Sequence, residues 1–198
     1  MICGIDEAGR GSLCGSLFVC GVACDNHMAD FLKDSGVKDS KMLSKNTRAQ
    51  LSSIIQNSPN IFFIVIEKNA QEIDTKGLSI CLKESILEII QKLQHLVKDF
   101  YIDGNTIFNI QPEASINLKS IIQGDSKIPQ ISAASILAKY AKDKEMEKLN
   151  QIYPAYNLIN NAGYGTKEHL EKIAILGQTP HHRKSFVIKS QQKNLKLF

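Results

Sequence analysis

Five short apolar stretches of strand length constrain the fold of this 198-residue chain more than any other feature. They cover residues 2–6, 17–24, 61–67, 99–103 and 116–123, and the third of them, IFFIVIE, is rich in β-branched and aromatic residues. Three of the stretches come before the chain begins to alternate strands with long helical segments. This order predicts an α/β fold in which helices cover a mixed sheet.

Helical periodicity fills much of the chain between and after these strands. The helical segments cover residues 45–57, 78–96, 131–149 and 166–176. Ser44 is placed to cap the first of them. The chain length suits one domain, so we expect a main domain over residues 1–150 and a helical extension with a basic tail over 151–198, packed on the same core.

The composition is that of an ordinary folded domain, with 43% hydrophobic and 22% charged residues. No apolar run approaches the roughly 18 residues that a membrane span needs. Asp6 and Glu7 interrupt the N-terminal apolar stretch where a signal peptide would continue, so we expect a cytoplasmic protein. The five cysteines form no CxxC pair, which favours buried, reduced thiols over a zinc site or a disulfide framework.

Positive charge is concentrated in the last third of the sequence. Residues 1–130 carry a net charge of −2 and residues 131–198 carry +6, which gives the total of +4. A near-neutral body with a basic end suits a protein that grips a polyanion from one side. A lysine-rich solvated surface would give the same numbers, so charge alone does not decide between the two.

Four acidic residues stand at or just beyond predicted strand ends. Asp6 and Glu7 follow the first apolar stretch, Asp103 ends the fourth and Asp125 follows the fifth. Adjacent strand residues point to opposite faces, so the first two can share a site only if their strand ends or twists at Glu7. A cluster of this kind needs cations, and oxygen ligands favour Mg²⁺ or Mn²⁺. Two such ions roughly 3.5–4 Å apart can support phosphodiester hydrolysis.

A plainer interpretation treats these acids as turn residues and helix caps. For Asp103 or Asp125 alone, that interpretation is the stronger one. Asp6 and Glu7 lie on an apolar strand, however, and buried ionised acids need partners.

The glycines at Gly9 and Gly11, on either side of Arg10, would let the backbone approach a ligand closely. A ribose 2′-hydroxyl is one group that backbone amides and carbonyls can recognise. A plain hairpin turn also explains these glycines, and the sequence contains no phosphate-binding P-loop motif.

Six sequence blocks carry a resemblance to a known family. They are GIDEAGRG (4–11), DSKMLS (39–44), IDGN (102–105), GDSKIPQISAASILAK (124–139), GYGTKEHL (163–170) and HHRKSF (181–186). In this order, spanning residues 2 to about 187, they resemble the type 2 ribonucleases H, specifically bacterial ribonuclease HII. The resemblance implies a ribonuclease H-like fold: a five-stranded mixed sheet with helices on both sides and a helical C-terminal extension.

The same resemblance implies an endonuclease that cleaves RNA within RNA–DNA hybrids. It also implies incision on the 5′ side of a single ribonucleotide embedded in duplex DNA, leaving a 3′-hydroxyl and a 5′-phosphate. The implied cofactor is Mg²⁺ or Mn²⁺, with two ions during catalysis. Nothing in the sequence demands a partner subunit, so a monomer is expected.

The family's motifs assign roles to individual residues of this chain. The implied metal-binding acids are Asp6, Glu7, Asp103 and Asp125. The implied readers of the ribonucleotide are the backbone of Gly9, Arg10 and Gly11 and the ring of Tyr164, which would stack on the next sugar. Residues expected near the active site and the backbone phosphates are Lys41, Ser132, Ser135 and Lys139.

The chain departs from the family pattern at several positions. Lys142 stands where arginine is usual, which keeps the charge but loses the bidentate geometry and puts a supporting ion pair in doubt. Serines replace the usual prolines at Ser12 and Ser16, and Ala162 replaces a common lysine. Asp143 is left with a supporting role, because the resemblance places the fourth site acid at Asp125. None of these departures touches the implied metal ligands.

Two signals come from the C-terminal end. The block HHRKSF predicts a structural or phosphate-facing role, since adjacent histidines rarely form a metal pair by themselves. The tail QKNLKLF resembles a bacterial sliding-clamp peptide, with anchors at Gln192, Leu195, Leu197 and Phe198. A frayed basic tail is the alternative.

Two other functions fit parts of the pattern. A sister nuclease on the same fold would cut long hybrids and ignore single ribonucleotides, but the residues Gly9–Gly11 and Tyr164 argue against it. A non-catalytic RNA–DNA hybrid-binding module would bind without cleaving in any metal, but the complete set of four acids argues against it. Cleavage assays on the two kinds of substrate separate these functions.

Overall fold

A five-stranded mixed sheet lies at the centre of the computed structural model, which describes residues 1–37 and 43–186. Its strands are β1 (Ile2–Ala8), β2 (Leu17–Cys24), β3 (Phe62–Lys68), β4 (Asp99–Asp103) and β5 (Asn117–Ile121), in the order β3-β2-β1-β4-β5. The five predicted strands are confirmed to within two residues at each end. β1 continues beyond the predicted end at Asp6, because Glu7 and Ala8 still pair with Val19 and Phe18 of β2.

The direction of the strands decides which residues meet. β1 is antiparallel to β2, and β2 is antiparallel to β3. β4 is parallel to β1 and to β5. The carboxyl ends of β1, β4 and β5 therefore lie at the same edge of the sheet.

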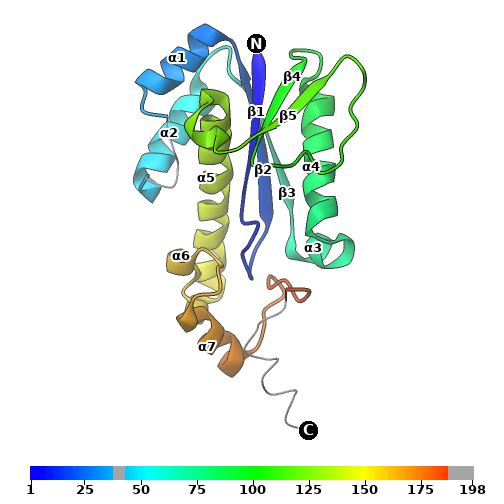
Figure 1. The fold of residues 1–198 in the computed structure, drawn as a ribbon. Coiled ribbons are helices and arrows are strands. Elements are labelled where there is room, and N and C mark those ends of the chain that lie inside the picture. The colour runs from blue at the N-terminus through cyan, green and yellow to red at the C-terminus, as the bar shows by residue number, and fades with distance from the viewer. Residues whose placement is uncertain (38–42, 187–198) are drawn as a thin grey trace.

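Helices cover both faces of the sheet (Figure 1). One face is covered by α3 (Ala70–Lys76) and α4 (Leu78–Leu93), and the other by α1 (Asn26–Asp34), α2 (Lys45–Asn57) and α5 (Pro129–Ile152). The remaining elements are η2 (Gly124–Ser126), η3 (Pro154–Tyr156), α6 (Leu158–Asn161) and α7 (Lys167–Leu176). The sheet with helices on both sides confirms the predicted fold class.

Local signals explain which helices the sequence revealed. Ser44 caps α2 as predicted, with its side chain accepting a hydrogen bond from the Thr47 amide. The sequence pattern did not predict α1 and α3, which are only 9 and 7 residues long. Their caps, Asp25 and Asn69, are residue types that also favour turns, so short segments of this kind are easily mistaken for loops.

Two hydrophobic clusters hold the layers together, one on each face of the sheet. The first packs α4 against β1, β2 and β4, and the second packs α1, α2 and α5 against β2. The backbone of α5 comes so close to β1 that a Cβ built on Gly4 would lie 2.2 Å from the Ile131 amide nitrogen. The absence of a side chain at Gly4 therefore allows α5 to pack directly against the centre of the sheet.

The short elements η3, α6 and α7 pack at the C-terminal end of α5, at the bottom of Figure 1. A third cluster joins Met146 and Leu149 of α5 to Tyr156, Leu158 and Ile173. α5 itself continues to Ile152, across the domain boundary predicted at residue 150.

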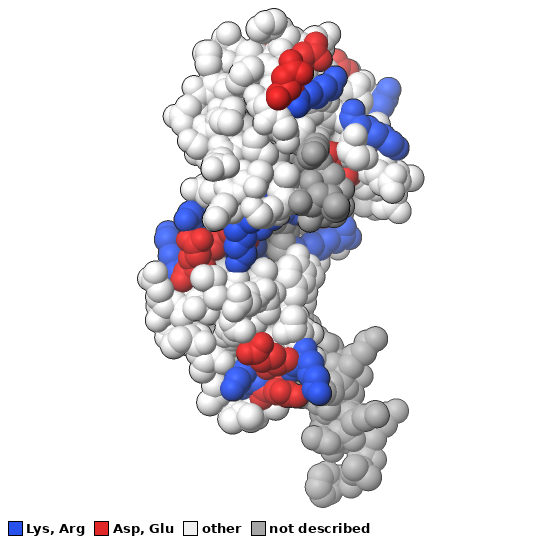
Figure 2. Space-filling view, turned by 90° about the vertical axis from the view of Figure 1, so that its left-hand side faces the viewer, with Lys and Arg blue, Asp and Glu red and all other residues white. Residues whose placement is uncertain are grey.

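Other sequence predictions concern buried thiols and the surface. All five cysteines are free and buried, as predicted. Among the described residues, no helix has both the length and the apolar character needed to cross a membrane. On the face shown in Figure 2, basic and acidic side chains lie side by side in several groups, and the groups are separated by uncharged surface.

Candidate active site

Three acidic side chains meet at the edge of the sheet where parallel strands end. Asp6 is on β1, Asp103 is the last residue of β4, and Asp125 is in the η2 turn between β5 and α5. One carboxylate oxygen from each lies within 4.8 Å of those of the other two. The convergence expected from strand-end positions is thus present for these three acids.

Local hydrogen bonds fix the geometry of this triad. Asp103 Oδ1 accepts from the Gly124 amide at 2.7 Å, which ties the end of β4 to the η2 turn. Ser132 Oγ donates to the Asp125 carbonyl oxygen at 2.6 Å, which ties the same turn to the first turn of α5. A Cβ on Gly124 would lie 2.6 Å from Ile131 Cδ1, so any other residue there would displace the end of the Ile131 side chain. The acids are therefore held by rigid elements.

The electrostatics of the cluster call for positive charge. The pKa of Asp6 is raised to about 7, first by burial and then by the neighbouring Glu7 and Asp103 carboxylates, against the lowering effect of a hydrogen bond with Ser135. Burial also raises the pKa of Glu7, which Arg10 lowers. A divalent cation would remove the repulsion among these oxygens, and an all-oxygen donor set suits a hard cation. The residues present therefore fit a divalent metal ion.

Glu7 occupies a different position from the other three acids. Because β1 remains paired as far as Ala8, Glu7 is on the opposite side of the strand from Asp6 and lies outside the triad. Its Oε1 atom is 3.5 Å from Arg10 Nη1, and the Arg10 guanidinium lies over the Phe108 ring. The strand does not end at Glu7, which was one of the two conditions for Asp6 and Glu7 to share a site, but Glu7 still lines the same cavity as Asp6 and Asp103.

An open cavity of about 490 Å³ lies over the acids. The lining residues include Asp6, Glu7, Gly9, Arg10, Asp103, Lys139 and Tyr164. Arg48 also lines it, although no sequence motif predicted a role for this residue. Its Nε and Nη2 atoms donate to Asp143 Oδ2 at 2.9 and 2.7 Å. The partners are 95 positions apart, so no local pattern signals the pair, and Asp143 is buried by it rather than exposed.

The glycine-rich loop between β1 and β2 runs along one wall of this cavity. Gly9 has a φ of +83°, and a Cβ there would lie 2.6 Å from the Ser16 carbonyl oxygen, so glycine is required at this turn. Within residues 1–37 and 43–186, the amides of Arg10 and Gly11 find no hydrogen-bond acceptor. These two donors are available to a ligand.

Tyr164 stands beside this loop. The Gly163 carbonyl oxygen accepts from the amides of Leu13 and Cys14 at 2.8 and 3.1 Å, which joins the two segments directly. A Cβ on Gly11 would lie 3.7 Å from Tyr164 Cε1, and the Tyr164 side chain is 45% exposed. The structure therefore brings two free amides and an exposed aromatic ring together at the mouth of the cavity.

The other predicted site residues have diverse positions. Ser132 and Ser135 are buried in α5, below Asp125 and Asp6. Lys139 is half-buried and faces the cavity. Lys41 lies outside the described residues, and so do the four predicted anchors of the C-terminal peptide, Gln192, Leu195, Leu197 and Phe198.

A family model and the curated relatives agree on one family, and solved structures share the fold. The family model described as ribonuclease HII matches residues 3–190. Ribonuclease HII of Helicobacter acinonychis (strain Sheeba) is 52% identical over 191 residues, covering 96% of this chain and 98% of that protein. Ribonuclease HII in the PCNA:RNase HII complex from Archaeoglobus fulgidus superposes with a TM-score of 0.79 at 30% identity, over the whole of both chains. The ribonuclease H2 from Pyrococcus horikoshii OT3 has a TM-score of 0.80 at 24% identity, covering 100% of this chain and 99% of that one.

Proposed function

The chain belongs to the ribonuclease HII family, a family of metal-dependent hydrolytic nucleases with ribonuclease H activity on RNA–DNA hybrids, and on this premise we propose its specific reaction. It incises on the 5′ side of single ribonucleotides embedded in duplex DNA, in addition to cutting the RNA strand of hybrids, and leaves a 3′-hydroxyl and a 5′-phosphate. The observation that carries this proposal is the placement of two free backbone amides beside the Asp6–Asp103–Asp125 triad.

The acids supply the metal site of the proposed reaction. Asp6, Asp103 and Asp125 provide oxygen donors from three elements, and Glu7 adds a fourth carboxylate on the wall of the cavity. We assign two divalent ions, Mg²⁺ or Mn²⁺, to this set. When bound, such ions activate a water molecule and stabilise the leaving oxygen of a phosphodiester. Lys139 faces the same cavity and is placed to meet a backbone phosphate.

The loop and Tyr164 supply the proposed recognition of the ribonucleotide. A 2′-hydroxyl oxygen can accept a hydrogen bond, and the Arg10 and Gly11 amides are donors without an acceptor among the described residues. The small Gly11 lets a sugar approach the backbone, and the exposed Tyr164 ring offers a surface on which the following sugar can pack. Backbone donors of this kind distinguish ribose from deoxyribose without reading the base.

A clamp-binding role is proposed for the C-terminal peptide. It rests on the sequence resemblance of QKNLKLF, with anchors at Gln192, Leu195, Leu197 and Phe198, and on the relative from Archaeoglobus fulgidus that forms a complex with PCNA. Apolar anchors of such a peptide would bind a hydrophobic pocket of the clamp while the lysines stay in water. Deletion of residues 192–198 should abolish binding to the clamp in a pull-down and leave cleavage of free substrates unchanged.

The first experiment on the reaction uses a labelled DNA duplex with one ribonucleotide, incubated with Mg²⁺, with Mn²⁺ or with a chelator. An all-DNA duplex and a full RNA–DNA hybrid are run alongside. Metal-dependent incision 5′ of the lone ribonucleotide, with the all-DNA duplex intact, is the expected result. Cleavage of the hybrid alone would contradict the roles given to Arg10, Gly11 and Tyr164. Binding without cleavage in either metal would instead favour a non-catalytic hybrid-binding module.

A further inference from the structure

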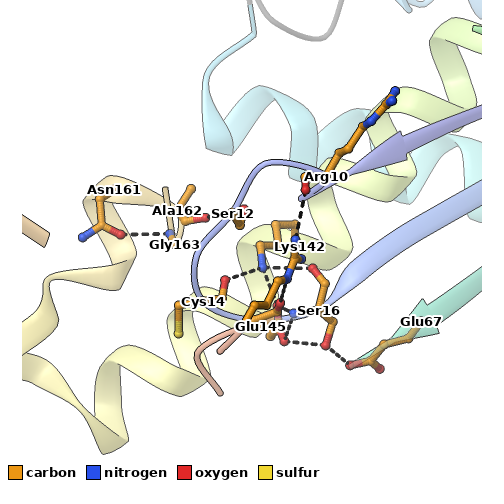
Figure 3. A network of polar contacts seen from close by, with 12 residues as sticks. Arg10, Ser12, Cys14, Ser16, Glu67, Lys142, Glu145, Asn161, Ala162 and Gly163 are labelled. Carbon is orange, nitrogen blue, oxygen red and sulfur yellow. Dashed lines mark hydrogen bonds and ion pairs between the residues drawn. The ribbon is translucent and has the colours of Figure 1, made fainter. Parts of the chain in front are cut away.

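The loop that carries the free amides is held from its inner side by two buried cations. Lys142 of α5 is 4% exposed, and its Nζ atom donates to the carbonyl oxygens of Cys14 and Ser16, both at 3.1 Å. Figure 3 shows this ammonium beneath the loop, between the two carbonyls. Glu145 Oε2 lies 2.9 Å from the same Nζ and neutralises its charge.

Arg183, in the HHRKSF segment of the C-terminal extension, is the second buried cation. Its Nε atom donates to the Gly15 carbonyl oxygen and its Nη1 atom to the Arg10 carbonyl oxygen, both at 3.0 Å. Its backbone amide donates to the Leu13 carbonyl oxygen at 2.8 Å. One residue of the extension therefore holds three carbonyl groups of the loop.

The free-energy cost of burying the charged Arg183 side chain indicates a role beyond packing. The side chain is 1% exposed, and none of the described carboxylates forms an ion pair with it. Its Nη2 atom is buried without a hydrogen-bond partner among the described residues, and the guanidinium carbon lies 5.1 Å from the centre of the Phe186 ring. Burial lowers its pKa to about 10, so it stays charged at neutral pH. The Glu145 and Asp74 carboxylates favour the charged form but offset only part of the cost of burial. Buried polar groups without a partner concentrate at functional sites.

Peptide geometry connects Arg183 to the free amides. In a trans peptide the carbonyl and the following N–H point in opposite directions. Arg183 Nη1 holds the Arg10 carbonyl toward the protein interior, so the Gly11 N–H of the same peptide unit is directed outward. Gly11 has no side chain to resist rotation of this peptide, and without the guanidinium it would be free to turn.

We propose that Arg183 is a positioning residue for ribose recognition: by binding the Arg10 carbonyl oxygen it fixes the outward direction of the Gly11 amide beside Tyr164. The inference rests on the proposed recognition of a 2′-hydroxyl by this loop. Lys142 holds the other end of the loop in the same way, at Cys14 and Ser16. The C-terminal extension thereby sets the sugar specificity of a site whose acids all come from the sheet and its adjoining turn.

The test measures binding rather than cleavage. Affinity is compared for a duplex with one ribonucleotide and for an all-DNA duplex of the same sequence, in EDTA, where hydrolysis cannot occur. Arg183→Met should lower the ratio of the two affinities about five- to tenfold, as expected for the loss of one well-placed hydrogen bond, with DNA affinity nearly unchanged. Arg183→Lys should restore part of the ratio, since an ammonium can still reach one of the carbonyls.

Lys184→Met serves as the matched control, because it removes one positive charge from the exposed neighbour and leaves the loop contacts intact. Lys184→Met should lower the affinity for both duplexes by the same factor, as the loss of a purely electrostatic contact does. If Arg183→Met does not fold, Arg183→Lys alone decides, and a parental ratio in either folded variant overturns the inference. A parent that incises the lone ribonucleotide yet binds both duplexes equally in EDTA also overturns it. A parent that cuts only long hybrids contradicts the proposed function itself.

Discussion

The imidazole rings of His169 and His182 face each other in the interior with their Nε2 atoms 3.1 Å apart. His182 Nδ1 accepts from the Thr179 amide at 2.9 Å, so its proton is on Nε2. His169 Nδ1 lies 2.9 Å from the Tyr164 carbonyl oxygen and must donate to it, so its Nε2 is the acceptor. These backbone partners fix both tautomers, and the neutral pair links the HHRKSF segment to Tyr164.

Acid should therefore destabilise the protein through this pair. Burial, followed by the neighbouring His169, lowers the pKa of His182 to about 4, whereas an unfolded histidine titrates near 6.5. Between these values the unfolded chain binds more protons than the native one, so stability is complete above about pH 6.5 and falls as the pH drops toward 4. The loss from His182 should approach about 3 kcal/mol.

Urea denaturation between about pH 7 and pH 4.5 measures this loss. His182→Asn should flatten the dependence on pH, and His95→Asn, at an exposed histidine, should keep the parental slope. Equal slopes for the parent and His182→Asn would show that the histidine pair is not the cause.

Asp103→Asn should nearly abolish cleavage while preserving binding of the substrate. Asparagine can still accept the hydrogen bond from the Gly124 amide, so the turn stays in place, but it removes a charge from the triad. The loss should exceed the roughly 10- to 100-fold cost of substitutions outside the first coordination shell. Single-turnover cleavage and the affinity for the duplex with one ribonucleotide, measured in EDTA, check the two effects. A variant that cleaves like the parent would refute the metal assignment.

Two alanine substitutions in the loop should have different effects: Gly11→Ala should impair substrate recognition, and Gly9→Ala should impair stability. A methyl on Gly11 would sit 3.7 Å from Tyr164 Cε1, in ordinary contact, so Gly11→Ala should fold normally but obstruct the approach of a sugar. A methyl on Gly9 would meet the Ser16 carbonyl oxygen at 2.6 Å, so Gly9→Ala should lower the melting temperature. The KM for the lone-ribonucleotide duplex tests Gly11→Ala, and thermal melting tests Gly9→Ala. A normal KM for a folded Gly11→Ala variant would argue against recognition at this loop.

Lys142→Met should be strongly destabilising. It leaves the Cys14 and Ser16 carbonyls without their shared donor and leaves the Glu145 carboxylate without its buried cation. Removal of one partner of a buried ion pair costs about 3–5 kcal/mol. Lys144→Met, which breaks an exposed pair with Glu147 on the same helix, should cost no more than about 1 kcal/mol. Similar losses in the two variants, measured in urea, would contradict the role given to Lys142.

The local features of the fold could be predicted from the sequence. The strands were identifiable because apolar and β-branched residues cluster in runs of strand length, and α2 because Ser44 precedes a periodic segment. Glycine placement near Arg10 and the acids at strand ends also marked the candidate site. Where a strand end depends on a partner strand, local reasoning was wrong: the pairing of Ala8 with Phe18 extends β1 beyond Glu7.

The sequence by itself determined the five strands, the longer helices, the family and the chemistry of the acids, because backbone propensity and motif spacing act over a few residues. Only the tertiary structure decided which three acids meet, and which cations hold the loop beside them. Arg48 meets Asp143 across 95 positions, and Arg183 meets the Arg10 carbonyl across 173. Such contacts depend on where the packing of the sheet, α5 and the C-terminal extension places each side chain. No periodicity along the chain predicts a contact between residues so far apart in the sequence.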